Sequence, residues 1–344
     1  MVLLIREKDI QSVGLSAEEV IHAVEKAYSQ DGRGLAHETP RLEIKIKGRD
    51  LPHIAPGTTS IGQGMAYLEE DKAFVISLTH HFDFHKYISQ VIDPGTGETL
   101  AIVKRSRGPL GDRAEGIDSG GLRTGAAAAI GAKYMANKSI ETVGVVGTGR
   151  VGAASLLCLS KVIDFKHVLA HSGRRKDEKF SENMGEMIDV EVKAAENPKD
   201  VVINSDILIT ATYATIPVVK GEWLKEGVHI SGMGADGPKK AELDIDAVKK
   251  AGKIVVDSEK CLSIGEIAHA LEKGVIKREG IHGRIGEVVA GIKPGRETVQ
   301  EITFFESDGT HMQSAAVVWA IYRKVKEAGL GIETSEIGSF FVNP

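Results

Sequence analysis

The stretch VGVVGTGRVG, residues 143–152, decides how the rest of the chain is interpreted. It is a Gly-x-Gly-x-x-Gly turn that directly follows an apolar run and opens a helical stretch. In this context the first glycine permits a tight turn, the second lets the backbone approach a pyrophosphate, and the third lets helix and strand pack closely. The first N–H groups of the helix then attract phosphate. The turn predicts a dinucleotide site with contacts from Gly147, Thr148, Gly149, Arg150, Val151 and Gly152.

The pattern around this turn predicts a parallel sheet. Helical stretches alternate with strand-like runs, which lie at 142–147, 167–172, 191–195, 206–213, 228–234 and 301–307. Regular β–α alternation is typical of a Rossmann-type, doubly wound parallel sheet with helices on both faces. Helical spacing also marks 122–136 and 315–329. We therefore expect an α/β dinucleotide domain over residues 122–307.

The first third of the chain predicts a different kind of domain. Ser16 and Glu19 form a capping box that opens an amphipathic helix. Residues 41–48 alternate apolar and charged side chains, as a half-buried strand does, and further strand-like runs follow at 73–78, 87–93 and 99–103. Residues 104–121 are polar and glycine-rich, which favours a surface loop; the alternative is that its arginines reach the active site or a partner subunit. We therefore expect helix plus antiparallel sheet, an α+β domain, over residues 1–121.

The stretch AHSGRRKD, residues 170–177, bears on the choice of dinucleotide. In such folds an acid at the end of the second strand selects NAD by binding the ribose 2′-hydroxyl, whereas a small polar residue followed by arginine accommodates a 2′-phosphate. Here Ser172 is followed by Arg174 and Arg175, and Asp177 lies too far into the next helix to replace the acid. We predict NADP(H) as the preferred cofactor, with NAD(H) also possible. The alternative is that the cations form a solvated first helical turn.

Composition favours an ordinary globular protein in a reducing compartment. The 344 residues are 42% hydrophobic and 26% charged, with a net charge of -5, which argues against a nucleic-acid or membrane surface as partner. Cys158 and Cys261 cannot build a disulfide framework and are expected to be buried thiols. The N-terminus has no signal-peptide pattern, and no apolar run approaches the ~20 residues of a membrane span. A cytoplasmic location is expected.

Several short motifs occur in order along nearly the whole chain. They are Gly-x5-Pro-Arg at 34–41, Thr-Gly-x-x-Leu-Ala at 96–101, Leu-Arg-Thr-Gly at 122–125, Gly-Ala-Asp-Gly-Pro at 234–238 with Glu-Leu-Asp at 242–244, Ile-Gly-Glu-Val at 285–288 and Phe-x-Ser-x-Gly at 305–309. With the glycine turn, they resemble the ornithine cyclodeaminase/μ-crystallin family, and most closely its archaeal-type alanine dehydrogenases. The resemblance implies a homodimer. It also implies that residues 1–121, completed by 308–344, bind substrate and dimerise.

The resemblance further implies roles for individual residues. Arg41 and Arg123 match the arginines that hold a substrate α-carboxylate and orient its α-carbon against the nicotinamide. Asp236 matches the acid that transfers a proton or stabilises the iminium; the structural alternative is an Asx turn before Gly237. The remaining matches on the cofactor side are Thr124, Thr212, Gly232, Met233, Lys240 and Ser307.

The chain departs from the family at one substrate-side position. The family usually carries a Gly-x-Lys-aromatic strand whose lysine touches the substrate, and the run from Gly64 to Tyr67 has Ala66 at the lysine position. Lys72 is the candidate replacement for substrate binding, or else Lys86, and either requires a shifted strand register. If neither serves, amine handling differs from the family norm and cyclodeamination is less favoured.

A histidine-rich segment offers a further alternative. His81, Asp83 and His85 alternate, so one face of a single strand could present three metal ligands. The family needs no metal, and no metal site is predicted. One of these histidines, or the neighbouring His80, could instead supply a proton-transfer group.

Together these observations predict an NAD(P)-dependent oxidoreductase. It would act on the C–N bond of a small α-amino or α-imino acid by hydride transfer at the α-carbon, as an imine reductase or an amino acid dehydrogenase. Two alternatives stay open. One is an ornithine cyclodeaminase-type ammonia lyase that recycles its cofactor internally. The other is a non-enzymatic, NADPH-dependent binding protein for a small carboxylate.

Overall fold

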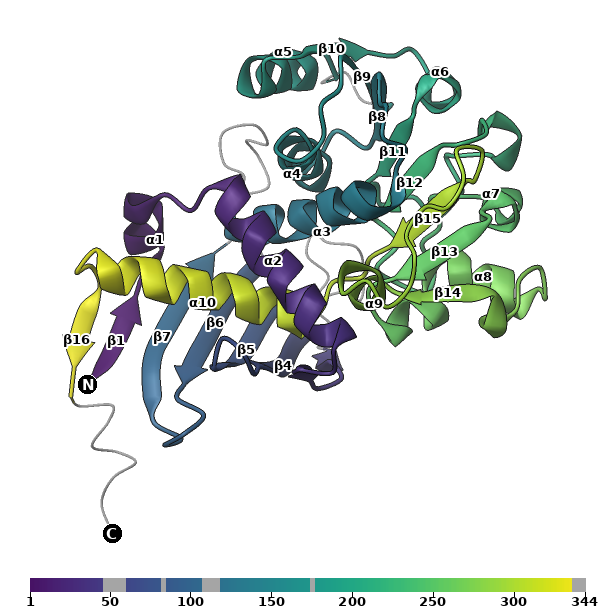
Figure 1. Ribbon diagram of the computed structural model, residues 1–344. Helices are drawn as coiled ribbons and strands as arrows, with labels where there is room; N and C mark the ends of the chain where they lie inside the picture. Colours follow the sequence, from purple (N-terminus) through teal and green to yellow (C-terminus); the bar gives the residue numbers. More distant parts are fainter. Residues whose placement is uncertain (46–59, 82–84, 107–117, 174–176, 336–344) are drawn as a thin grey trace. The chain divides into compact units, whose positions relative to one another are not determined.

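The structure, a computed structural model, describes residues 1–45, 60–81, 85–106, 118–173 and 177–335 (Figure 1). These residues form two compact units. Unit 1 contains the described residues up to 106, residues 118–120 and those from 311 onward, and unit 2 runs from 121 to 310. Among the described helices, none is both long and apolar enough to cross a membrane.

Unit 1 is built on a mixed sheet that packs against helix α10. The strand order is β16-β1-β7-β6-β5-β4-β2, with β3 also pairing with β4, and the neighbours are antiparallel except for β1 and β7. The strands are β1 Val2–Ile5, β2 Ala36–Glu38, β3 Leu42–Lys45, β4 Ser60–Leu68, β5 Ala73–His81, β6 His85–Ile92, β7 Thr99–Ser106 and β16 Ile332–Thr334. The helices are α1 Glu7–Val13, α2 Ala17–Gly32 and α10 His311–Glu327. Helix α10, yellow in Figure 1, crosses the strands and also contacts α2.

Local sequence explains the start of α2 and corrects one predicted loop. The Ser16 hydroxyl accepts a hydrogen bond from the Glu19 N–H at 3.2 Å, and the Ser16 N–H donates to the Glu19 carboxylate at 2.7 Å, so the capping box is confirmed. Residues 104–106 were predicted as loop but complete β7, because their backbone pairs with β6. Residues 119–121 likewise begin a helix. The intervening 107–117 lie outside the described residues.

The single strand expected to carry His81 and His85 is wrong. Strand β5 ends at His81, β6 begins at His85, and these two residues pair across a hairpin. Asp83 lies outside the described residues. The two histidines therefore lie on neighbouring strands and not along one strand.

Unit 2 is built on a parallel sheet of eight strands in the order β10-β9-β8-β11-β12-β15-β13-β14. The strands are β8 Thr142–Val146, β9 His167–His171, β10 Glu191–Ala194, β11 Ile207–Thr210, β12 His229–Gly232, β13 Lys253–Val256, β14 Ile281–Arg284 and β15 Thr303–Glu306. The α-helices are α3 Ser119–Met135, α4 Arg150–Leu159, α5 Asp177–Ile188, α6 Pro198–Asn204, α7 Ile245–Lys250, α8 Gly265–Glu272 and α9 Ile285–Val289. Short 3-10 helices span Gly221–Trp223, Glu259–Ser263 and Arg278–Gly280.

The core of unit 2 explains why its strands were recognisable. Strands β11, β12, β13 and β15 are buried along their whole length. Such strands have near-continuous apolar runs, as parallel strands covered on both faces do. Strands β13 and β14 were not predicted, because β13 has only three apolar residues after Lys253, and in β14 His282 follows the single apolar residue Ile281. The expected α/β, Rossmann-type sheet is confirmed, and the carboxyl ends of its strands meet at one edge, where such sheets bind ligands.

Candidate active site

The predicted glycine turn lies between β8 and α4, as a dinucleotide site requires. Gly147 has a φ of 111°, a conformation that favours glycine, and its N–H donates to the carbonyl of His171 at 2.8 Å. A β-carbon built on Gly152 would lie 2.1 Å from the Gly147 carbonyl oxygen, so the third glycine permits the close packing of α4. A β-carbon built on Gly149 would meet nothing within 4 Å. The second glycine therefore leaves open space at the start of α4, where Arg150 begins the helix.

A carboxylate lies at the end of β9. Asp177 is a buried residue that begins α5, and it accepts hydrogen bonds from the Ser172 N–H at 2.9 Å and the Ser172 hydroxyl at 2.5 Å. The Thr148 hydroxyl donates to the same carboxylate at 2.8 Å. The expectation that Asp177 lies too far along to reach this place was wrong, because left-handed backbone at Gly173 (φ 68°) bends the chain directly after Ser172. Residues 174–176 lie outside the described residues.

Glu242 joins the carboxyl ends of β11 and β12. Its fully buried carboxylate accepts hydrogen bonds from the Thr210 hydroxyl (2.8 Å), the Thr212 N–H (2.5 Å) and the Gly234 N–H (2.9 Å). Burial raises the pKa of Glu242, and the three donors oppose that rise by favouring the charged form. The Met233 N–H also donates to the Thr210 carbonyl, at 2.9 Å. Two loops that carry predicted cofactor contacts are thereby fixed to each other.

Asp236 lies in the loop after β12, with 59% of its side chain exposed. Its N–H donates to the Gly234 carbonyl at 3.0 Å. Lys240 forms an ion pair with the Asp236 carboxylate, and its ammonium group lies 4.5 Å from the centre of the Tyr213 ring. The loop therefore presents a carboxylate and an ammonium group side by side, near the edge where the strands of the parallel sheet end.

Arg123 projects from α3 onto the segment that follows β15. Its Nη2 donates to the Thr124 hydroxyl at 3.3 Å. A β-carbon built on Gly309 would lie 3.1 Å from the same nitrogen. The guanidinium therefore lies against the glycine of the Phe-x-Ser-x-Gly motif.

Ser307 ties together the carboxyl ends of three strands. Its hydroxyl donates to the Asp257 carboxylate at 2.6 Å, and its N–H donates to the carbonyl of Gly232, the last residue of β12, at 3.0 Å. Ser307 is only 4% exposed. The Ser307 hydroxyl is thus bonded to Asp257, which follows β13 at the same edge of the sheet.

Two further buried acids, Glu266 and Glu306, escaped the sequence analysis. Burial, reinforced by repulsion from neighbouring carboxylates, raises the pKa of Glu266 to about 8 and the pKa of Glu306 well above its usual range. Glu306 packs against Gly232, since a β-carbon built there would lie 2.5 Å from its Oε2. The available signal was an acid at the end of the apolar run ITFFE, where a fully buried strand admits a charge only at a cost.

Unit 1 holds the other predicted substrate residues. Arg41 is exposed and directly precedes β3. Lys72 lies in the turn between β4 and β5, with a φ of 50°. Strands β4 and β5 pair without a break from Ser60 to Leu68, and β6 continues that register against β5. Ala66 is 1% exposed.

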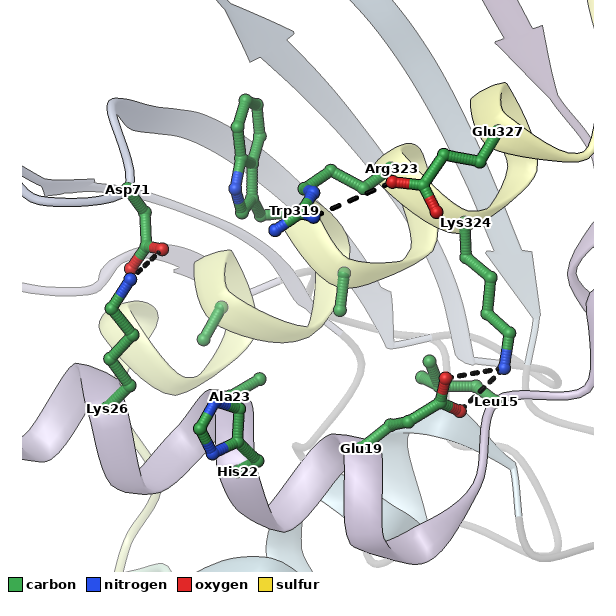
Figure 2. A pocket seen from close by; sticks show the side chains of 12 residues that line it. Leu15, Glu19, His22, Ala23, Lys26, Asp71, Trp319, Arg323, Lys324 and Glu327 are labelled. Carbon is green, nitrogen blue, oxygen red and sulfur yellow. Dashed lines mark hydrogen bonds and ion pairs between the residues drawn. The ribbon is translucent and has the colours of Figure 1, made fainter.

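A cavity of about 310 Å³ lies elsewhere in unit 1, between α2 and α10 (Figure 2). Figure 2 shows an ion pair between Lys26 and Asp71 on one side and another between Glu19 and Lys324 on the other. The predicted site residues do not line this cavity. We assign it no part in the reaction.

Comparison with known proteins identifies the family. The model of the ornithine cyclodeaminase/mu-crystallin family matches residues 3–329. The chain belongs to this family. The resemblance carried by the short motifs is therefore confirmed along almost the whole sequence.

Three members illustrate the range of relatives. An alanine dehydrogenase of Archaeoglobus fulgidus is 33% identical, over 96% of this chain and 97% of its own. The structure of Thermococcus litoralis Δ1-pyrroline-2-carboxylate reductase with NADH and L-proline has a TM-score of 0.84 and 31% identity, over 97% of this chain and 100% of its own. The iminosuccinate reductase of Paracoccus denitrificans with NAD+ has a TM-score of 0.85 and 25% identity, over 97% of this chain and 99% of its own.

Proposed function

We propose that the protein is an NAD(P)-dependent oxidoreductase that acts on the C–N bond of a small α-amino or α-imino acid. The observation that carries the proposal is the open space at Gly149, at the start of α4, in a chain of this family. A nicotinamide dinucleotide fits this place, because its pyrophosphate can approach a residue without a side chain and meet the first N–H groups of a helix. Relatives that reduce imines or oxidise amino acids favour this chemistry over a purely binding role.

The proposed mechanism gives each side chain one task. A bound nicotinamide would supply or accept the hydride at the substrate α-carbon. Arg123 pairs with the α-carboxylate, and Arg41 is proposed for the same group, since guanidinium binds carboxylate through two parallel hydrogen bonds. Asp236 exchanges the proton at the substrate nitrogen, and Lys240 holds the Asp236 carboxylate by their ion pair. Imine reduction then consumes one hydride and one proton, and amino acid oxidation releases them.

Glu242 supports this mechanism without entering it. By bonding to Thr212 and Gly234, it fixes the loops that follow β11 and β12. Thr124, Gly232, Met233 and Ser307 remain proposed contacts on the cofactor side. Lys72 is not carried into the mechanism, because its turn position separates it from the strand face that Ala66 occupies.

NADP(H) is proposed as the preferred dinucleotide, with NAD(H) also accepted. Arg174 and Arg175 provide the positive charge that a 2′-phosphate requires. Asp177 places a negative charge at the same strand end and opposes that preference. The two solved relatives described above contain NADH and NAD+. We therefore propose a modest preference rather than exclusion of NAD(H).

A homodimer is proposed from one apolar face of unit 1. The residues that share this face by strand pairing, and that are at least 37% exposed, are Leu42, Ile44, Ile61, Leu78 and Ile88. Burial of such a face against a second copy would remove a patch of the kind that marks protein interfaces. A solved archaeal alanine dehydrogenase of this family is a dimer. Ile44→Glu is expected to shift the sedimentation mass from dimer to monomer, whereas a monomeric wild type would contradict the proposal.

The direct test follows NADPH and NADH oxidation in parallel. Purified protein is given ammonia or methylamine with a panel of 2-oxo acids, and separately a panel of cyclic imino acids. Turnover is expected with at least one substrate. Asp236→Asn should lower kcat by about 100-fold and leave the Kd for NADPH unchanged, while the exposed control Asp246→Asn should match the wild type. Ammonia release from ornithine without net cofactor consumption would instead establish the lyase.

A further inference from the structure

The imidazole of His311 lies directly on the backbone of strand β4. A β-carbon built on Gly64 would lie 1.9 Å from His311 Nε2 and 2.0 Å from Cε1. No side chain tolerates such a distance, so the ring occupies the place that any residue other than glycine would fill. His311 is the first residue of α10 and is half-buried. The absence of a side chain at Gly64 therefore leaves the space that the His311 ring occupies.

The imidazole shares a sheet face with Ala66. Side chains alternate along a strand, so positions 64 and 66 of β4 point to the same side. Ala66 is buried and has only a methyl group as its side chain. The imidazole occupies the side-chain place of position 64, two residues earlier on the same face of β4. This is the face that packs against α10, opposite to the apolar face that carries Ile61. The polar side chain on this face, the His311 imidazole, therefore comes from α10, whereas β4 has Ala66 there.

A second contact fixes the start of α10 at this place. The Glu38 carboxylate accepts a hydrogen bond from the Met312 N–H at 2.9 Å. Glu38 lies directly opposite Ala66 in the pairing of β2 with β4. A carboxylate at a helix start is also favoured by the helix dipole. The backbone beside His311 is thus held against the same point of the sheet, which limits the positions open to the imidazole.

We propose that His311 contacts the substrate and hydrogen-bonds its amino or imino nitrogen, so that it assists the proton exchange assigned to Asp236, in the place where other members of the family use a strand lysine. An imidazole gives and takes a proton near neutral pH and can hydrogen-bond an amine or an imine. His311 also follows Gly309, the glycine against which Arg123 lies, by two residues in the chain. This inference rests on the proposed function for its substrate class, and it assigns a residue that the family motifs do not include.

The experiment compares wild type with four variants, using the substrate that the panel identifies. His311→Ala should lower kcat by about 100-fold, the low end of general acid–base effects, with the Kd for NADPH and the Tm unchanged. Gly64→Ala should cause a similar loss, because its methyl group displaces the ring. Gly62→Ala is the matched control, since its β-carbon would meet only the Leu42 carbonyl oxygen at 3.6 Å. The double variant His311→Ala/Ala66→Lys should recover part of the lost kcat.

Two results would overturn the inference. The first is a His311→Ala enzyme with the kcat and KM of the wild type. The second is a loss of activity that the strand lysine fails to rescue and that accompanies a fall in Tm, which would make His311 a packing residue. Absence of turnover in the wild-type protein would contradict the proposed function. The contact between His311 and the substrate is then tested separately, by substrate binding. In that case L-proline and L-alanine, with NADPH present, should raise the Tm of wild type but not of His311→Ala, and equal shifts or none would reject the role.

Discussion

The Thr148 hydroxyl donates a hydrogen bond to the Asp177 carboxylate at 2.8 Å, which joins the glycine turn after β8 to the first residue of α5. Ser172, at the end of β9, bonds to the same carboxylate through its N–H and its hydroxyl. One acid therefore organises both segments that a dinucleotide ribose and pyrophosphate would meet. It also places a carboxylate at the end of β9.

Replacing Asp177 by Asn should shift cofactor preference toward NADP(H). The amide retains the shape of the side chain but removes the charge that repels a 2′-phosphate. We expect the ratio of the NADH Kd to the NADPH Kd to rise by about tenfold, equivalent to about 1.4 kcal/mol. Fluorescence titration with each cofactor measures the two Kd values, and the variant Asp164→Asn, at an exposed residue, is the control. An unchanged ratio would mean that Asp177 only braces the turn.

Gly149→Ala should weaken cofactor binding without weakening the fold. The added methyl group meets nothing in the protein within 4 Å, and the residue has an ordinary φ of -89°. The methyl group would, however, occupy space that the pyrophosphate needs. We expect the Kd for NADPH to rise at least tenfold, or about 1.4 kcal/mol, with an unchanged Tm. Normal affinity would show that the cofactor binds elsewhere.

Gly152→Ala should behave in the opposite way. Its β-carbon would lie 2.1 Å from the Gly147 carbonyl oxygen, which is backbone and cannot move aside cheaply. Forcing α4 away from the turn should destabilise the protein by about 1–3 kcal/mol, as overpacking generally does. Chemical denaturation measures this loss directly. A variant as stable as the wild type would contradict the close packing of α4 on the turn.

The buried acids predict a loss of stability as pH rises. The pKa of Glu266 is about 8 in the folded state and near 4.5 when unfolded, so between these values the folded protein binds the extra proton. The free energy of unfolding should therefore fall as pH rises from 4.5 to 8, by at most about 1.4 kcal/mol per pH unit for this group. Glu266→Gln should flatten that decline, and Glu272→Gln, exposed on the same helix, should not. Parallel wild-type and Glu266→Gln curves would show that the carboxyl is ionised in the fold.

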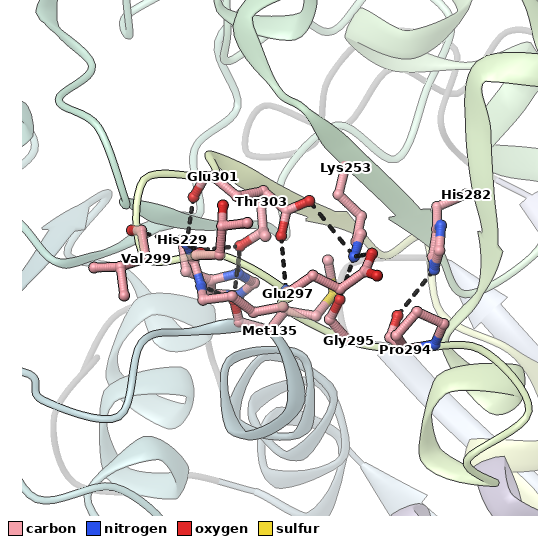
Figure 3. Close-up of polar contacts among 12 residues, drawn as sticks. Met135, His229, Lys253, His282, Pro294, Gly295, Glu297, Val299, Glu301 and Thr303 are labelled. Carbon is pink, nitrogen blue, oxygen red and sulfur yellow. Dashed lines mark hydrogen bonds and ion pairs between the residues drawn. The ribbon is translucent and has the colours of Figure 1, made fainter.

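His229 predicts a separate loss of stability in acid. Burial, assisted by the charge of Arg296, lowers its pKa to about 3 from 6.5. Its ring nitrogens hydrogen-bond with Thr303 (2.9 Å) and Ser231 (3.1 Å), and Figure 3 shows it within a polar cluster of unit 2. The unfolded chain binds the extra proton between pH 6.5 and 3, so stability should fall as pH falls through this range.

The measurement is urea denaturation of His229→Gln at several pH values below 6.5. Its acid limb should be shallower than that of the wild type by up to about 1.4 kcal/mol per pH unit. His22→Gln, exposed on α2, serves as the control. Identical acid limbs for wild type and His229→Gln would show that the buried ring titrates normally.

Much of the fold could be predicted because its signals are local. The glycine turn, the capping box at Ser16 and the apolar runs of β8, β11 and β12 each depend on residues within a few positions of one another. The family motifs are equally short. Errors arose where a pairing partner decided the structure, as at residues 104–106 and at the hairpin between His81 and His85.

The candidate site was predictable only in part, for the same reason. Asp177 was dismissed because distance along the chain was taken for distance in space. Glu242, Glu266 and Glu306 are separated by many residues in the sequence, and only the sheet edge brings their carboxyl groups into one buried region. His311 could not be linked to Gly64, because nothing in the sequence states which strand the helix start would touch.

The sequence by itself determined the family, the parallel sheet and the glycine turn, because backbone geometry and apolar periodicity are properties of neighbouring residues. The tertiary structure alone decided which side chains share an environment. It placed Asp177 on Ser172 and Thr148, and the His311 ring on Gly64. The physical reason is that contacts between distant segments depend on strand register and helix packing, which arise from the whole chain and leave no mark within any short stretch of it.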